Sequence, residues 1–496
     1  MNDPNPNRSV SDVAVISLGG RFLAFIGRTL YIGRFGAVNP LLNAFTYALH
    51  IPQMLFSIVA AALNSVMIPL YSGLLAEEKH EEANRFINNI INIVIGLLII
   101  FVFTGILAAP LVSRIVGGAD FTETAYLTFS LRVLMPAMFF FSFGAIFTGL
   151  LQSHGSFRLP ALVSAPGGAI LILYVILFGD RFGVTGLLFA TLLGVAMQPL
   201  IMIPAIRKLG YRYSFSIDLK NENIRAAGRL CIPALISVVS YQAHFIFANS
   251  MALRMGYAAV MDYAQQMVQV FIIIIVLAVA AVYLPRLSAL WAKKNRTEYN
   301  ENLKNAFSYI IFLVLPAACG LVLLRYEIMD FLLNWRGEGD TRTAGILMGL
   351  YAVGIVSMAL KEIADRAFYS MKDAKTPAVF GIVIMACNIA VTIALIPRLG
   401  VYAMPTAYAV AAAIGTSGLL VRLQIKVRFI DRSLVWETAK AAVAVAVMAV
   451  GVYAVKYFVP VANRLLAVAL PALMGVAVYF VMARLLRCKA ITERMK

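Results

Sequence analysis

Arg21 and Arg28 lie seven residues apart inside the first apolar stretch of the chain. Seven residues advance an α-helix by almost two turns, so both side chains are expected on one face, about 10 Å apart. An arginine at the centre of a membrane-spanning helix costs about 2.5 to 3.5 kcal/mol on insertion scales, and such charges usually face a water-filled cavity or a partner. A guanidinium binds two phosphate oxygens at once. The spacing therefore predicts a cavity that accepts a phosphate-bearing substrate, although Arg21 alone would also suit an anchor at the membrane surface.

Other polar groups are sparse in the apolar segments. Arg132 falls in the fourth segment and Asp262 opens the eighth, while His50 and His244 fall in the second and seventh. A lone histidine is more often a hydrogen-bonded structural group than a proton relay, so both histidines are expected to be structural. Arg34 lies near the end of the first segment, where a long side chain reaches the interface, and is expected to be an anchor.

Four further charges form two pairs at helical i,i+4 spacing, Lys361 with Asp365 and Glu362 with Arg366. Pairs at this spacing face each other on a helix. We expect a self-neutralised cluster near the cytoplasmic end of the tenth helix. The same groups, with Asp262, are candidates for a gate or a counter-ion.

The composition indicates a polytopic membrane protein. Of 496 residues, 61% are hydrophobic and 13% charged, and mean hydropathy is +0.85, whereas soluble domains are nearer half apolar and a quarter charged. The net charge of +18 is typical of basic cytoplasmic loops and does not indicate a nucleic-acid partner. The four cysteines show no metal-ligand or paired spacing, so we expect no metal site.

About fourteen segments are long enough to cross roughly 30 Å of hydrocarbon. The first, 13–36, is expected to be a retained helix rather than a signal peptide. Lys and Arg concentrate in alternate loops and in both terminal tails, which places both termini in the cytoplasm. The expected segments are 13–36, 40–73, 86–111, 125–151, 158–179, 184–206, 230–253, 256–285, 305–324, 343–371, 376–397, 401–422, 433–457 and 465–486.

The sequence repeats itself at an offset of about 216 residues. The stretch from Pro69 aligns without a gap on the stretch from Pro285, and 153–161 and 181–184 match 370–378 and 398–401 one residue further on. When a repeat unit spans an even number of helices, its two copies cross the membrane in the same direction, as the halves of two-lobed transporters do. The fold expected is therefore an all-α membrane protein with two six-helix lobes and two C-terminal helices. Its expected parts are a tail (1–12), an N-lobe (13–206), a linker (207–229), a C-lobe (230–425), helices 13 and 14 (426–486) and a tail (487–496).

Several activities lack their sequence signatures. The chain contains no phosphate-binding G-x-x-x-x-G-K-[ST], no H-E-x-x-H and no nucleophile elbow. Its outer loops are too short to hold a catalytic domain of the usual size. We therefore expect a transporter rather than an enzyme, without a cofactor, driven by a Na+ or H+ gradient, the membrane potential or the substrate gradient.

The chain resembles the MurJ/MviN-type lipid II flippases of the MOP superfamily from end to end. RAFYSMKDAKTP at 366–377 is similar to that family's signature, which runs from a tyrosine to Lys-Thr-Pro after helix 10. Supporting stretches lie at 20–28, 43–45, 51–55, 67–72 and 299–303. The resemblance implies that Arg21 and Arg28 line the central cavity and meet the pyrophosphate of a lipid carrier.

The chain departs from the family pattern at several cavity positions. Thr29 and Asn43 stand where the family has aspartates, and Gln266 stands at an arginine position. In the second segment Phe56, Ser57 and Ala60 replace charged residues. The departures leave the transporter class intact and leave the glycan open.

The leading hypothesis is a flippase for an undecaprenyl-pyrophosphate-linked saccharide in the bacterial cytoplasmic membrane. Arg132 would be a weaker phosphate contact, while Asn43, Gln242 and Gln266 would bond to sugars, and the polyprenyl tail would lie in a groove against helices 13 and 14. Partners would be the lipid bilayer and proteins of cell-wall or polysaccharide synthesis. Alternatives are a flippase for an exopolysaccharide, capsule or O-antigen unit, a cation-coupled drug exporter, a membrane enzyme of polysaccharide assembly or a non-transporting scaffold.

Overall fold

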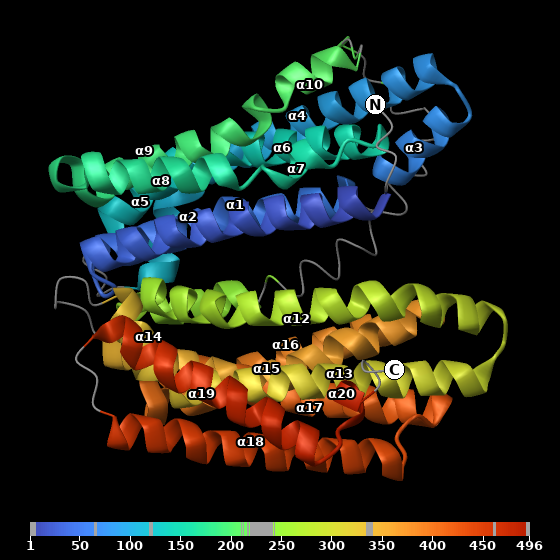
Figure 1. Ribbon diagram of the computed structural model, residues 1–496. Helices are drawn as coiled ribbons and strands as arrows, with labels where there is room; N and C mark the ends of the chain where they lie inside the picture. The colour runs from blue at the N-terminus through green and yellow to red at the C-terminus, as the bar shows by residue number, and fades with distance from the viewer. Residues whose placement is uncertain are drawn as a thin grey trace. The chain divides into compact units, whose positions relative to one another are not determined.

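Long helices build the protein, as the sequence predicts (Figure 1). The computed structural model describes residues 6–63, 67–118, 123–209, 211, 213–215, 218, 242, 244–333, 341–459 and 463–492, and it has no strand within these ranges. The predicted seventh segment, 230–253, and the linker 207–229 fall largely outside the described residues. The chain divides into two compact units, Met1–Gln242 with Asn249–Ala259, and Ala243–Ala248 with Val260–Lys496.

The first unit is a bundle in which α1 packs on α8 and α2 packs on α5 and α6. Its apolar core includes Leu63, Phe86, Leu98, Met138 and Leu150. Its helices are α1 (Pro6–Phe35), α2 (Pro40–Ala62), α3 (Ile68–Ala76), α4 (His80–Gly117), α5 (Thr124–Leu134), α6 (Ala137–Ser153), α7 (Arg158–Ala161), α8 (Ala165–Leu177), α9 (Gly179–Leu200) and α10 (Ile203–Lys208).

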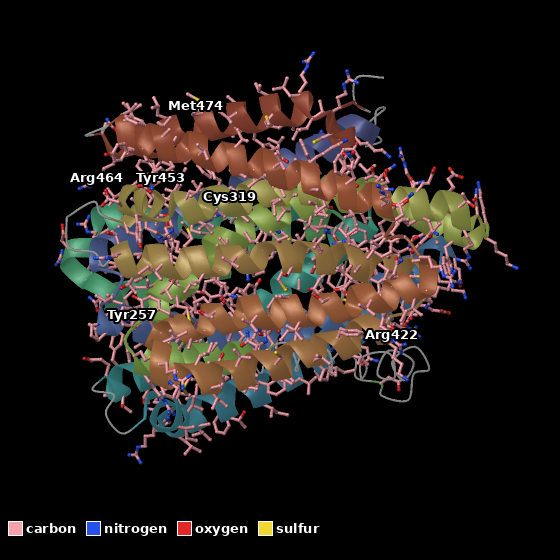
Figure 2. The ribbon with its side chains drawn as sticks, turned by 90° about the horizontal axis from the view of Figure 1, so that it is seen from below. Tyr257, Cys319, Arg422, Tyr453, Arg464 and Met474 are labelled. Atoms are coloured by element: carbon pink, nitrogen blue, oxygen red, sulfur yellow. The ribbon has the colours of Figure 1, made fainter. Side chains whose placement is uncertain are left out.

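The second unit packs α15 against α13 and α17, and it adds a pair formed by α18 and α19. Figure 2 labels Tyr453 on α18 and Arg464 on α19 near the same end of this pair. The helices are α12 (Ala258–Ala292), α13 (Arg296–Leu323), α14 (Arg325–Leu333), α15 (Thr341–Ser370), α16 (Lys375–Leu399), the 3-10 turn η2 (Gly400–Tyr402), α17 (Ala403–Val427), α18 (Arg432–Phe458), α19 (Arg464–Leu485) and α20 (Lys489–Thr492).

Eleven stretches of the described residues are long and apolar enough to cross a membrane. One of them, Lys375–Val427, contains the two expected spans α16 and α17, and α2 with α3 covers the expected span 40–73. Apolar length accounts for these helices, because a backbone in lipid must satisfy its hydrogen bonds within itself. Polar caps mark several starts: the side chains of Asn39, Asn295, Asp431 and Asn463 each accept a bond from the first turn of a helix.

The repeated sequence is accompanied by a repeated backbone. Three turns in the first unit adopt a positive φ angle, and so do the three residues at the matching repeat positions in the second unit. The pairs are Glu78 (60°) with Lys294 (58°), Gly155 (76°) with Lys372 (60°), and Gly183 (55°) with Gly400 (55°). Left-handed residues are uncommon outside glycine, so this agreement supports the alignment of the two halves.

Candidate functional site

Small residues fix the rotation of α1. Gly27 lies so close to α8 that an added Cβ would be 3.0 Å from the Gly168 carbonyl oxygen, and a Cβ on Gly168 would be 2.6 Å from the Ala24 nitrogen. Gly20, seven residues before Gly27, likewise faces Ser164. Because successive residues are 100° apart on a helix, Arg21 and Arg28 lie together on a face next to this glycine seam.

The structure places Arg28 beside a polar group of α2. Arg21 is exposed and Arg28 is partly buried. Arg28 interacts electrostatically with His50, whose ring also hydrogen-bonds the Gln53 side chain. His50 was expected to be structural, and its nearness to Arg28 makes it a candidate site residue.

The polar row continues along α2. His50, Gln53 and Ser57 follow i, i+3, i+7 spacing, which puts them on one helix face. Gln242 Nε2 donates to Ser57 Oγ at 2.7 Å, so the structure joins the predicted sugar-binding Gln242 to this row. We define the polar row as Arg28, His50, Gln53, Ser57 and Gln242. The i, i+3, i+7 spacing was the signal that sequence reasoning missed.

The row offers a cation, an imidazole, two amides and a hydroxyl on neighbouring surfaces of the first unit. A guanidinium suits phosphate oxygens. Amides and hydroxyls donate and accept hydrogen bonds, as sugar hydroxyls do. The arrangement can therefore hold a phosphorylated saccharide, and it contains no group arranged as a nucleophile with its base.

Asn43 is committed to the backbone. It is 0% exposed, its Nδ2 donates to the Gly256 carbonyl at 2.7 Å, and its Oδ1 accepts from the Ala259 N–H at 2.8 Å. The amide thus holds the chain at the start of α12. This geometry supports a structural role and lends no support to the expected sugar contact.

The other predicted residues are spread over both units. Arg132 is exposed on α5, with Nε donating to the Ile106 carbonyl of α4 at 3.4 Å. Asp262, which is 2% exposed, and the partly buried Gln266 lie one turn apart on α12 in the second unit. Arg34 pairs with Asp180.

The charge cluster of α15 forms the pairs that its spacing predicted. Lys361 Nζ lies 2.5 Å from Asp365 Oδ2, with both side chains largely buried, and Arg366 lies 3.8 Å from Glu362. Removing one partner of a buried pair strands the other charge. The cluster is therefore expected to stabilise this part of α15, and a gating role stays a prediction.

The 366–377 motif builds the turn between α15 and α16. Asp373 accepts from the Thr376 N–H at 3.1 Å and its hydroxyl at 3.0 Å, and Lys426 of α17 donates to the same carboxylate at 2.9 Å. The Lys426 ammonium, with these further bonds, lowers the pKa of Asp373 below its ordinary value. In this motif Asp373 thus bonds to the first turn of α16 and ties that turn to α17.

An apolar cavity lies within the second unit. It has a volume of about 520 Å³ and is bounded by α12, α13, α14, α18 and α19. Its lining includes Phe271, Pro316, Phe331, Val452, Val476 and Phe480. Figure 2 labels Cys319 and Met474 on two of these helices, α13 and α19. A cavity so lined suits a hydrocarbon chain.

One protein family covers most of the sequence. The model of the family described as lipid II flippase MurJ matches residues 34–470. This range begins after Arg21 and Arg28, so the family match does not include these two arginines.

Curated relatives carry the same description. A probable lipid II flippase MurJ of Rhizobium tropici is 27% identical over 87% of this chain and 84% of its own length. A probable lipid II flippase MurJ of Bdellovibrio bacteriovorus is 25% identical over 91% of this chain and 89% of its own length.

Solved structures share the fold. A lipid II flippase MurJ in an inward closed conformation superposes with a TM-score of 0.82 at 19% identity, covering 95% of this chain and 98% of the other. An inward-facing multidrug resistance MATE family transporter of the MOP superfamily gives a TM-score of 0.70 at 18% identity, covering 83% of this chain and 98% of the other. The predicted all-helical membrane fold is confirmed.

Proposed function

The chain belongs to the lipid II flippase MurJ family, and we propose that it carries lipid II, an undecaprenyl-pyrophosphate-linked saccharide, across the bacterial cytoplasmic membrane. The family match over residues 34–470 carries this proposal. The protein is a multi-pass membrane transporter and not an enzyme. Its substrate would move from the inner to the outer leaflet by alternating access.

The polar row would receive the head of the substrate. Arg28, with Arg21 two turns before it, would bind the pyrophosphate through charge-assisted hydrogen bonds. Gln53, Ser57 and Gln242 would bond to the saccharide. The Ser57–Gln242 bond supports this assignment, because it holds the amide against the α2 face that carries His50.

The apolar cavity of the second unit would receive part of the polyprenyl tail. Its walls on α18 and α19 are the helices expected to hold the tail, and its lining is almost wholly apolar. Burial of hydrocarbon releases about 25 cal/mol per Å², so such a cavity favours a long isoprenoid.

We include the membrane orientation of the chain and the energy source of transport in this proposal. The basic loops support termini in the cytoplasm. A Na+ or H+ gradient or the membrane potential would drive transport, and cell-wall synthesis proteins would be its partners.

A second candidate is a flippase for another lipid-linked glycan. The uncharged Ser57 and Gln266 favour it, because they stand where the family pattern has charged residues. A cation-coupled drug exporter and a non-transporting scaffold have less support: the embedded arginines of helix 1 disfavour cationic drugs, and the polar row offers a substrate site.

Binding to the purified full chain in nanodiscs separates these candidates. We expect retention of lipid II in native mass spectra, weaker retention of undecaprenyl pyrophosphate bearing an O-antigen saccharide, and loss of both with Arg28→Ala. Arg28→Lys keeps the positive charge but lacks the planar guanidinium that binds two phosphate oxygens at once. This variant should bind both lipids with intermediate affinity. Preference for the O-antigen lipid would favour the second candidate, and equal binding by Arg28→Ala would overturn the assigned pyrophosphate contact.

A further inference from the structure

Exposed cations gather at one end of α16, α17 and α18. We define the α16–α18 patch as Lys372, Lys375, Arg422, Arg428 and Arg432, all of which are exposed. Lys375 and Arg432 are the first residues of α16 and α18, and Arg428 directly follows α17. Figure 2 shows Arg422 on this part of the second unit.

Specific contacts hold the patch together. Lys426 Nζ lies 2.9 Å from Asp373 Oδ2, which ties the end of α17 to the start of α16. Gln424 and Ile430 exchange two hydrogen bonds across the α17–α18 turn, at 2.7 and 3.2 Å. Phe429 stacks on Phe307 of α13 with ring centroids 4.8 Å apart. These contacts hold in place the backbone of the two turns that carry the cations.

Two acidic residues next to the patch, Asp373 and Asp431, are already paired. Asp373 binds Lys426, and Asp431 binds Lys304 at 2.9 Å. Each hydrogen-bonded lysine lowers the pKa of its carboxyl group, so both acids are charged at neutral pH and committed to their partners. Among the residues that the structure describes, no ion pair holds any of the five patch cations.

Apolar side chains alternate with the cations. Val421, Ile425, Ile430 and Val435 are exposed, and Trp436 is 64% exposed. Trp and basic residues at the ends of membrane spans are typical of the headgroup level, and juxtamembrane basic clusters attract anionic lipids. The exposed aliphatic side chains beside the cations fit the hydrocarbon next to these headgroups. An acidic soluble partner would bind the cations but leave the aliphatic side chains exposed to water, so the lipid is the better fit.

Most positions of the patch cations are not repeated in the first unit. At an offset of 217 residues, four of the five patch positions are uncharged in the first unit, and only Lys375 has a basic counterpart, Arg158. The uncharged counterparts are Gly155, Ala205, Tyr211 and Phe215. The first unit carries exposed cations at other positions of the corresponding helix end, Arg207 and Lys208, so the arrangement of the five patch cations is what distinguishes the second unit.

We propose that the α16–α18 patch binds the phosphate headgroup of an anionic glycerophospholipid in the surrounding leaflet. The cations contact the phosphate while the exposed aliphatic residues and Trp436 contact the acyl region. The proposal rests on the patch geometry and is independent of lipid II transport.

Native mass spectrometry of the purified full chain with phosphatidylglycerol tests the proposal, with phosphatidylcholine as the zwitterionic reference. The variant K375Q/R422Q/R432Q removes three patch cations and leaves the Lys426–Asp373 and Lys304–Asp431 pairs in place. The control R286Q/K293Q/K294Q removes the same charge from exposed residues at the α12–α13 hairpin. We expect phosphatidylglycerol binding to weaken about tenfold or more in the patch variant and less than about twofold in the control.

Equal losses in both variants would overturn the proposal by showing that only net charge matters, and so would an unchanged patch variant. Phosphatidylcholine binding as tight as phosphatidylglycerol binding would also overturn it. If the triple variant does not fold, Arg432→Gln and a salt titration of the intact chain replace it. Binding that does not weaken between about 0.05 and 0.5 M salt would then contradict a surface electrostatic contact.

Discussion

At the residue scale, the same amino-acid type serves different purposes in different surroundings. Arg28 lies beside His50 in the polar row, whereas Arg34 pairs with Asp180 and Arg254 donates to the last carbonyls of α4 at 2.6 and 2.8 Å. The roles of these arginines therefore differ with the groups that surround each side chain. The sequence could not predict these partners, because they lie on other helices.

Asn43→Ala is expected to destabilise the fold rather than weaken substrate binding selectively. The change leaves the buried Gly256 carbonyl and Ala259 N–H unpaired, and each such group costs about 1 to 3 kcal/mol. Thermal unfolding in detergent measures the loss, with the exposed Gln53→Ala as a control that should shift the midpoint little. Reduced lipid II binding without a lower midpoint would contradict the structural role of Asn43.

Asp373→Asn removes the charge of the carboxylate that ties α16 to α17. Asparagine keeps an oxygen that accepts from the Thr376 N–H. It replaces Oδ2, which accepts from Lys426 and from the Thr376 hydroxyl, so the ion pair and the hydrogen bond from this hydroxyl are lost. Because the pKa of Asp373 is lowered in the folded chain, the pair stabilises the fold above the ordinary carboxyl value and the contribution disappears as pH falls through the lower folded value. The pair is partly exposed, so the effect at pH 7 is below about 1 kcal/mol.

Unfolding midpoints of the Asp373→Asn variant and the intact chain at pH 7 and about pH 3 check this sign. The difference should shrink at the lower pH. A difference of equal size at both values would show that the variant acts through packing rather than charge.

At the element scale, the sequence predicted the helices well because lipid imposes a length and an apolar character on each span. The register of the repeat also came from sequence, and positive φ angles at Lys294 and Lys372 support it. The roles of Asn43 and His50 could not be predicted, since they depend on which helix faces lie together. Of the predicted site, Gln242 joins the row that contains Arg28, while Arg132 bonds elsewhere.

Gly168→Ala tests whether the glycine seam positions Arg28. A Cβ at this position would lie 2.6 Å from the Ala24 nitrogen, so α1 would have to move, and overpacking costs about 1 to 3 kcal/mol. We expect a lower unfolding midpoint and several-fold weaker lipid II binding. Gly19→Ala is the matched control, because nothing lies within 4 Å of its added Cβ and alanine favours helix.

Normal lipid II binding by a folded Gly168→Ala variant would contradict the positioning role of the seam. Equal losses in Gly19→Ala would show that any change in the glycines of α1 or α8 disturbs binding.

At the scale of the whole molecule, the proposal assigns the two parts of one amphiphile to two chemically different sites. The first unit supplies the polar row and the second supplies the apolar cavity of about 520 Å³. A lipid-linked saccharide has the matching division into a charged head and a hydrocarbon tail. The family match adds the transport activity that neither site shows alone.

Ala472→Phe tests the tail site by filling the cavity from α19. Binding of full-length lipid II should weaken several-fold, while binding of an analogue with a short isoprenoid should change little, because only the long tail needs the space. Leu473→Phe is the control, since Leu473 is 71% exposed. Equal weakening for both ligands would contradict a tail site here.

The most direct test of the flippase account is the accessibility of lipid II at the outer leaflet of cells depleted of their own flippase. The cells would express this chain or its Arg28→Ala variant, with membrane insertion of both verified. We expect the intact chain to restore outer-leaflet lipid II and the variant not to restore it. Failure of the inserted intact chain would contradict lipid II transport, and full restoration by Arg28→Ala would contradict the pyrophosphate site in helix α1.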